Sequence, residues 1–228
     1  MPKTLMWAGI AVLAAVGAGG LAGCTSVGSA PGAAAAAAPD YDALTAALMT
    51  ASFRDQGIAR VDRLQQDTSN LECSKAQGRG LPEARARAIE AANLATLQMP
   101  ADGKLLGDWK EGEKLAQNGR GMTWTDPSAD AAANGGNCYN CHQLDKAEIS
   151  YGTLGPSLYR YGAIRGVTDP SSPAARPIVE YTWGKLWNAR AYNACSGMPR
   201  FGHAKLLSTE QLRHLMALLL DPKSPVNQ

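Results

Sequence analysis

The sequence predicts an all-α protein. Near its C-terminus the apolar residues follow the i, i+3, i+4, i+7 spacing of one helix face, in the stripe Leu212, Leu215, Met216 and Leu219. Other stretches are rich in helix-forming residues and carry capping signals. Almost no segment alternates apolar and polar residues as a half-buried strand does. We therefore expect helices joined by loops.

The chain opens with an export signal. Lys3 supplies a positive start, and the apolar run that follows it, residues 6–21, is short for a membrane-spanning helix, which needs about 20 apolar residues. Leu21–Cys24 resembles a bacterial lipobox, so we expect residues 1–23 to be a lipoprotein-type signal peptide and Cys24 to carry lipid.

Ordinary cleavage within the alanine run Ala33–Ala38 is the alternative to lipidation. In either case residues 24–39, which are rich in Ala and Gly, are expected to form a flexible tether. The formal net charge of +2 shows no basic excess of the kind that nucleic-acid binding requires.

Residues 40–105 are expected to form an N-terminal helical extension. The stretch 40–66 is rich in Ala and Leu, lacks Pro, and begins with Asp40, which suits an N-cap. A second helical stretch opens at Leu81–Ala84, where Pro82 suits the first turn, and runs to about Gln98.

From residue 106 the composition changes, and residues 106–228 are expected to form a separate domain. Its last helix follows a capping box at Ser208–Gln211 and ends before Pro222. Gly and Pro mark the turns between the elements. The earlier helices are predicted over Trp109–Gln117, around Asn137–Asp145 and over Glu180–Ala191.

The pentapeptide Cys138–His142 has the CxxCH pattern of c-type haem attachment. Two thiols three positions apart can each add to a vinyl group of one haem, and the adjacent imidazole of His142 can reach its iron. A thioredoxin-like redox pair does not require the histidine, and a zinc cluster would need a second CxxC, which the chain lacks. We therefore predict one covalently bound haem c, with Cys138 and Cys141 as its attachment points.

The remaining cysteines, Cys73 and Cys195, form an even pair in an exported protein, which favours a disulfide. The alternative is that Cys195, close to Met198, is a reactive thiol or an iron ligand.

Met198 is the expected second axial ligand of the iron, because it lies on a loop beside Pro199 and ahead of the last helix. Met/His ligation raises the reduction potential and suits an electron acceptor. His203 and Met122 are the competing candidates, and His214 is expected to be a satisfied residue on the last helix. Arg200 is expected either to meet a haem propionate or to be an ordinary surface arginine.

A helix, CxxCH, a middle helix, a methionine loop and a final helix is the order of a small cytochrome c, so the domain resembles that fold. In cytochromes c the proximal histidine commonly donates to a proline carbonyl in a Gly-Pro turn, and by that resemblance Pro156 is expected to orient His142. Tyr181, Trp183 and Trp187 are expected either to line the haem or to pack in the core.

The chain resembles one family in particular: SoxX, the monohaem cytochrome c subunit of the bacterial sulfur-oxidation complex SoxAX. The resemblance covers about Cys73 to Gln228. It is carried by the segments Gly107–Trp109, Gly136–Leu144, Gly155–Leu158, Asn193–Cys195, Met198–Gly202 and Leu220–Asn227.

This resemblance implies a periplasmic electron-transfer subunit with no catalytic residues of its own. Its partners would be a SoxA-like cytochrome subunit, the carrier SoxYZ transiently, and an electron-accepting cytochrome c, with thiosulfate coupled oxidatively to the carrier cysteine (an L-cysteine S-thiosulfotransferase). The lipobox departs from this family and implies a membrane contact through lipid. A free-standing tethered carrier or redox sensor, or an enzyme with an open iron, are the alternatives.

Overall fold

The computed structural model describes residues 38–228, and the signal peptide, Cys24 and most of the tether lie outside this range. Within it the chain forms α-helices, 3-10 turns and loops, with no strand; one isolated antiparallel bridge joins Gln56 and Ala59. The predicted all-α class is confirmed. No helix of residues 38–228 has the length and apolar character needed to cross a membrane.

The chain divides after Ala47 into two compact units. Helix α1 (Tyr41–Ser52) begins where the Asp40 carboxylate accepts a hydrogen bond from the Ala43 amide at 2.9 Å, and it buries no side chain. The predicted helix over 40–66 is wrong beyond Ser52. Gly57 adopts a positive φ of 54°, which an α-helix cannot accommodate, and only the 3-10 turn η1 (Val61–Leu64) follows.

The second unit, residues 48–228, contains most of the expected extension together with the expected domain. Helix α2 (Thr68–Lys75) was not predicted; the Asp67 carboxylate caps it by accepting from the Asn70 amide. Helix α3 (Glu83–Leu94) follows Pro82 as predicted and ends four residues before Gln98.

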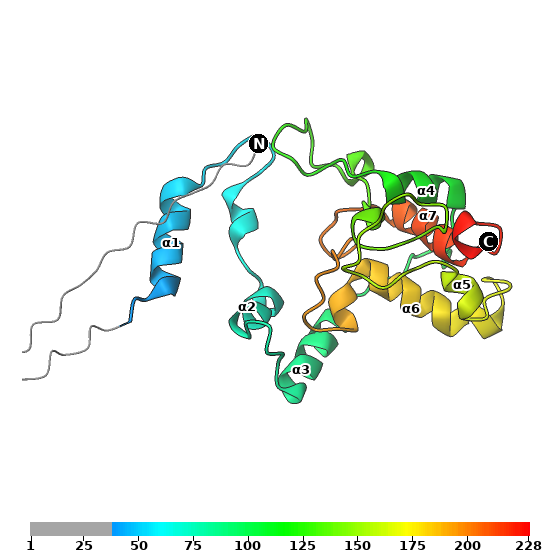
Figure 1. Ribbon diagram of the computed structural model, residues 1–228, viewed down its shortest axis with the longest axis horizontal. Coiled ribbons are helices and arrows are strands. Elements are labelled where there is room, and N and C mark those ends of the chain that lie inside the picture. Colours follow the sequence, from blue (N-terminus) through cyan, green and yellow to red (C-terminus); the bar gives the residue numbers. More distant parts are fainter. Residues whose placement is uncertain (1–37) are drawn as a thin grey trace, which may run out of the picture. The chain divides into compact units, whose positions relative to one another are not determined.

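Helices α4 (Trp109–Gln117) and α7 (Thr209–Leu220) pack side by side (Figure 1). Both begin at caps that the sequence contains: Asp108 caps α4, and both hydrogen bonds of the Ser208–Gln211 capping box are formed at the start of α7. The helices approach closely at Gly112, where a Cβ atom would lie 2.2 Å from the His214 carbonyl oxygen.

Helix α6 (Arg176–Trp187) begins four residues before the predicted start, with Pro177 in its first turn, and α7 also packs against it. The helix α5 (Tyr161–Ile164) forms a single turn. The other short elements are the 3-10 turns η2 (Ala131–Ala133), η3 (Cys138–Asn140), η4 (Pro173–Ala175), η5 (Ala189–Ala191) and η6 (Pro225–Asn227).

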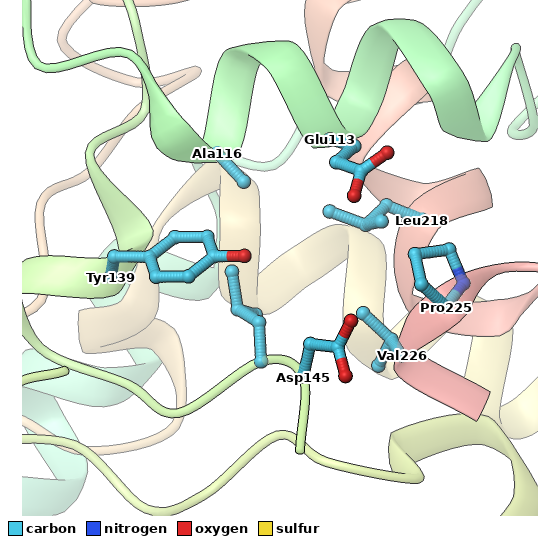
Figure 2. A pocket seen from close by; sticks show the side chains of 8 residues that line it. Glu113, Ala116, Tyr139, Asp145, Leu218, Pro225 and Val226 are labelled. Atoms are coloured by element: carbon cyan, nitrogen blue, oxygen red, sulfur yellow. The ribbon is translucent and has the colours of Figure 1, made fainter. Parts of the chain in front are cut away.

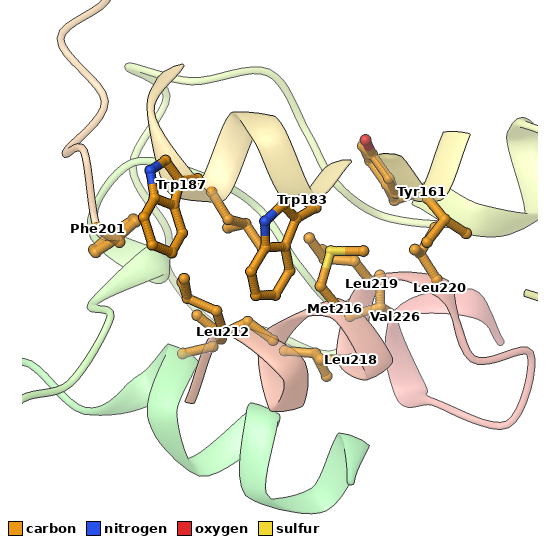
Figure 3. Close-up of a cluster of buried hydrophobic side chains, with 14 of the residues drawn as sticks. Tyr161, Trp183, Trp187, Phe201, Leu212, Met216, Leu218, Leu219, Leu220 and Val226 are labelled. Carbon is orange, nitrogen blue, oxygen red and sulfur yellow. The ribbon is translucent and has the colours of Figure 1, made fainter. Parts of the chain in front are cut away.

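The core lies between α6 and α7 (Figure 3). Trp183 is fully buried at its centre, and Leu212 and Met216 of α7 are equally inaccessible. Burying one such side chain stabilises the fold by about 1.5–3 kcal/mol. The apolar stripe predicted for the last helix is therefore a core face, and Trp183 and Trp187 both belong to the core cluster.

The expected extension is joined to this core by polar contacts. The indole N–H groups of Trp183 and Trp187 donate to the backbone carbonyls of Gln98 (2.9 Å) and Thr96 (3.0 Å). Buried Asn188 donates to the Asn93 side chain at 3.0 Å. Residues 68–100 and residues 106–228 therefore share one compact unit.

Candidate functional site

The Cys138–His142 segment is not the helix predicted over 137–145. Only η3 forms, and it follows Asn137, whose φ is +49°. The Cys138 carbonyl accepts from the amides of Cys141 and His142, which closes a single turn.

The helix stops because later residues take the carbonyls that it would need. The Tyr139 carbonyl accepts from the Gly152 amide at 2.8 Å, and the Cys141 carbonyl accepts from the Gly155 amide at 2.8 Å. A third bond of 2.7 Å joins the Leu158 amide to the Gln143 carbonyl. The loop 152–158 thus holds the motif in place through its backbone.

Two glycines make this close approach possible. A Cβ atom at Gly152 would lie 1.8 Å from the Asn140 carbonyl oxygen, and one at Gly155 would lie 2.1 Å from Cε1 of His142. Neither position tolerates a side chain without moving the motif. In the sequence Gly155 is recognisable as part of a Gly-Pro turn, whereas no local pattern marks Gly152.

The His142 ring has one hydrogen-bond partner among residues 38–228. Its Nδ1 lies 2.7 Å from the Pro156 carbonyl oxygen, the contact that the resemblance to cytochromes c implies. A carbonyl can only accept, so Nδ1 carries the proton and the lone pair is left on Nε2. The ring is therefore held in the tautomer that a metal-ligating histidine uses.

The two cysteines of the motif are free thiols, and both residues are half-buried. Cys138 packs against the core cluster, and desolvation raises the pKa of its thiol to about 12. The Cys138 sulfur is thus neutral at physiological pH and has an apolar environment. Within residues 38–228 no group of three His, Cys, Asp or Glu side chains is placed to hold a metal ion alone.

Met198 packs against the same core cluster as Cys138, on the loop between η5 and α7. Its amide donates to the Ser196 hydroxyl at 3.2 Å. The predicted disulfide is present just before it, joining Cys73 and Cys195 with a sulfur–sulfur distance of 2.04 Å. Cys195 is therefore not a free thiol.

Arg200 is engaged within the protein. Its guanidinium lies 2.5 Å from the Asp67 carboxylate, and its side chain is only 17% exposed, so it is not an ordinary surface arginine. Asp67 also faces Arg190, at 3.7 Å. The contact of Arg200 with a haem propionate stays a prediction.

The competing ligand candidates have other environments. His203 is an exposed residue, and partial desolvation of its ring together with the nearby Arg200 charge lowers the pKa of its imidazole. Met122 lies in a turn with φ of +63°, and its carbonyl accepts from Arg63. His214 accepts from the Asp108 amide at 2.9 Å and lies 3.6 Å from Glu210, as expected for a satisfied residue.

The three aromatic residues singled out in the sequence divide into two groups. Trp183 and Trp187 stack with a centroid separation of 6.1 Å inside the core, whereas Tyr181 is 38% exposed and meets Tyr192 edge-on. Core packing accounts for both tryptophans in this structure.

A narrow pocket opens beside the motif, between α4, α7 and the C-terminal turn (Figure 2). Its volume of about 10 Å³ holds roughly one water molecule. An open hollow of about 430 Å³ adjoins it, and both include Tyr139, whose pKa burial and Glu148 raise to about 12. The acidic residues around them are Glu113, Asp145 and Glu148.

No protein-family model matches the chain. A protein from Aquifex aeolicus (strain VF5), described as an uncharacterized lipoprotein, is 36% identical to it over 138 residues. The match covers 59% of this chain and 59% of that protein, so the chain spans less than two thirds of the relative's length.

Proposed function

We propose that this protein is a c-type cytochrome that transfers electrons outside the cytoplasm. The observation that carries the proposal is the arrangement of the CxxCH motif: two free thiols precede a histidine whose Nδ1 is held by a backbone carbonyl and whose Nε2 is left to bind metal. A redox dithiol has no need for this tautomer control.

The residues present fit a haem c. Cys138 and Cys141 would hold it through thioether bonds, and His142 Nε2 and the Met198 sulfur would ligate its iron. The desolvated, neutral Cys138 thiol suits an apolar partner. When bound, the haem supplies a one-electron couple whose potential a methionine ligand raises. The Pro156 carbonyl keeps the proton on Nδ1, and Gly155 keeps the face of the ring free of side chains.

The cellular setting is proposed from three features together. The lipobox at Leu21–Cys24, the relative described as a lipoprotein, and the Cys73–Cys195 disulfide all support an exported protein anchored by lipid at Cys24. Mass spectrometry of the exported chain tests this point: a diacylated Cys24 N-terminus is expected, and an intact peptide across Gly23–Cys24 contradicts it.

The finer proposal is that the protein is the SoxX-like subunit of a thiosulfate-oxidising complex, supported by the sequence resemblance over Cys73–Gln228. Its role there is to accept electrons and pass them to a cytochrome c, while the partner subunit makes the sulfur–sulfur bond. Electron transfer requires only that the iron be fully ligated, and Met198 and His142 are the residues that would ligate it.

Expression with a cytochrome c maturation system tests the proposal. The purified chain should carry one covalent haem that survives denaturation, and the Cys138→Ala/Cys141→Ala variant should carry none. Absence of covalent haem from the wild-type chain would refute the cytochrome assignment. Failure to co-purify with a second haem subunit, or to support thiosulfate-dependent cytochrome c reduction, would refute the finer proposal and leave a free-standing carrier.

A further inference from the structure

The loop that carries Met198 has little internal structure to hold it. Its local bonds are those of tight turns: the Cys195 and Ser196 amides donate to Asn193, and the Met198 amide donates to Ser196. Such turns set the local path of the chain but do not fix the loop relative to the core. Its position must come from contacts with other segments.

Met198 itself packs against the core cluster. The polar and covalent contacts that bracket it on both sides come from residues 67–90. Before it, Cys195 is bonded to Cys73, and the Ala194 amide donates to the Glu90 carboxylate at 3.1 Å. After it, Arg200 pairs with Asp67 at 2.5 Å.

Helix α2 and its cap present the residues that make these contacts on one face. Asp67, Asn70 and Cys73 are spaced at i, i+3 and i+6, so they lie on one face. Each contacts the segment 190–200: Asp67 binds Arg200, Asn70 accepts from Arg190 at 2.5 Å, and Cys73 forms the disulfide.

Apolar burial does not explain α2. Its one buried residue is Ser69, and Leu71 is 41% exposed, so the helix adds no apolar side chain to the core. Ser69 accepts from Asn93, which in turn accepts from Asn188, and this buried chain of polar groups fixes α2 to the end of α6.

We infer that α2 and its cap form a clamp that positions the Met198 loop, with Asp67 as the positioning residue that acts through Arg200. This inference rests on the proposed function, because it concerns the presentation of the Met198 sulfur to a haem iron. The disulfide restrains one side of Met198 covalently, and the Asp67–Arg200 ion pair restrains the other side.

The decisive variant is Asp67→Asn. Asparagine caps helices about as well as aspartate, so α2 keeps its start while Arg200 loses its anionic partner. Glu72→Gln is the matched control, since Glu72 lies on the same helix but pairs with Arg85 of α3. Asp67→Glu is the conservative variant, which restores the charge.

Two readouts are expected to change in Asp67→Asn. The red charge-transfer band of methionine-ligated ferric haem should weaken or disappear in the loaded protein. Hydrogen exchange of the amides of residues 194–198 and 200 should accelerate by about 10- to 100-fold, the change expected from a lost hydrogen bond between charged groups. Asp67→Glu should recover part of both, and Glu72→Gln should match the wild type. The Cys73→Ser/Cys195→Ser variant should accelerate exchange in the same amides.

An unchanged band and unchanged exchange in both Asp67→Asn and the double serine variant would overturn the clamp. Failure of the proposed function looks different: the wild-type chain would carry no haem. In that case hydrogen exchange alone tests the clamp. Faster exchange of these amides in Asp67→Asn supports the clamp, and exchange at the wild-type rate refutes it.

Discussion

Substitution of Gly155 by alanine is the sharpest test of the CxxCH geometry. The added Cβ atom would lie 2.1 Å from Cε1, 2.4 Å from Nδ1 and 2.7 Å from Nε2 of His142. Ordinary van der Waals contact begins at 3.4 Å, so the ring or the loop must move by more than an ångström. The φ angle of Gly155 lies outside the positive region, so the clash, and not backbone strain, is what the variant introduces.

The movement has a defined cost. Overpacking of this kind destabilises a protein by about 1–3 kcal/mol. The clash also disturbs the 2.7 Å contact between His142 Nδ1 and the Pro156 carbonyl oxygen, because Nδ1 is among the displaced atoms. The Gly155 amide also donates a hydrogen bond to the Cys141 carbonyl, so the loop cannot move away from the motif without breaking this hydrogen bond.

Urea denaturation and covalent haem content measure the effect. Gly155→Ala should lower the free energy of unfolding by about 1–3 kcal/mol and reduce the haem carried per chain. Gly197→Ala is the matched control: it adds the same methyl group in the other site loop, has no atom within 4 Å, and should change neither quantity. If the two variants behave alike, the packing of Gly155 against His142 does not constrain the motif.

The remaining predictions concern the polar and covalent framework. The Cys73→Ser/Cys195→Ser variant should lose about 2–4 kcal/mol of stability in urea denaturation, since the bond closes a separation of 122 residues; a stability equal to wild type would contradict this. Asn188→Ala should cost about 1–3 kcal/mol in thermal unfolding, because Asn93 and Thr96 lose their buried donor, whereas exposed Asn140→Ala should be neutral. Burial raises the pKa of Asp67, but the Asn70 amide and Arg200 outweigh it and hold that pKa below 3.8. The stabilisation of the fold by the ionised Asp67 carboxylate is therefore complete above pH 3.8 and is lost as the pH falls through the lower pKa of the folded protein. Asp67→Asn should consequently flatten the acid limb of a plot of unfolding free energy against pH.

Local signals explain which helices the sequence could predict. Helix α4 has the predicted bounds because Asp108 caps it, and α7 starts at a complete capping box and presents an apolar stripe to the core. These determinants lie within a few residues of the helix that they start.

The helix predictions fail where contacts with residues distant in the sequence determine the local structure. The motif helix fails because Gly152 and Gly155 donate to carbonyls that a helix would have used. Helix α2 could not be predicted from apolar periodicity, because polar contacts to residues 188–200 stabilise it and such contacts leave no apolar pattern in the sequence. Only its cap at Asp67 and the paired Cys73 gave a local hint.

The two halves of the proposed iron site are held by different parts of the chain. The loop 152–158 fixes His142 through backbone bonds and two closely packed glycines. Residues 67–90 fix the Met198 loop through a disulfide, an ion pair and the Glu90 contact. Cys138 and Met198 both pack against the core cluster.

The segment 67–90 therefore belongs to the proposed site, although the sequence assigns it to a separate extension. A change there acts on the Met198 side and leaves the bonds of the CxxCH loop intact, whereas a change at Gly155 acts on the His142 side. Haem retention and methionine ligation should consequently respond to different substitutions. This separation follows from the contacts alone.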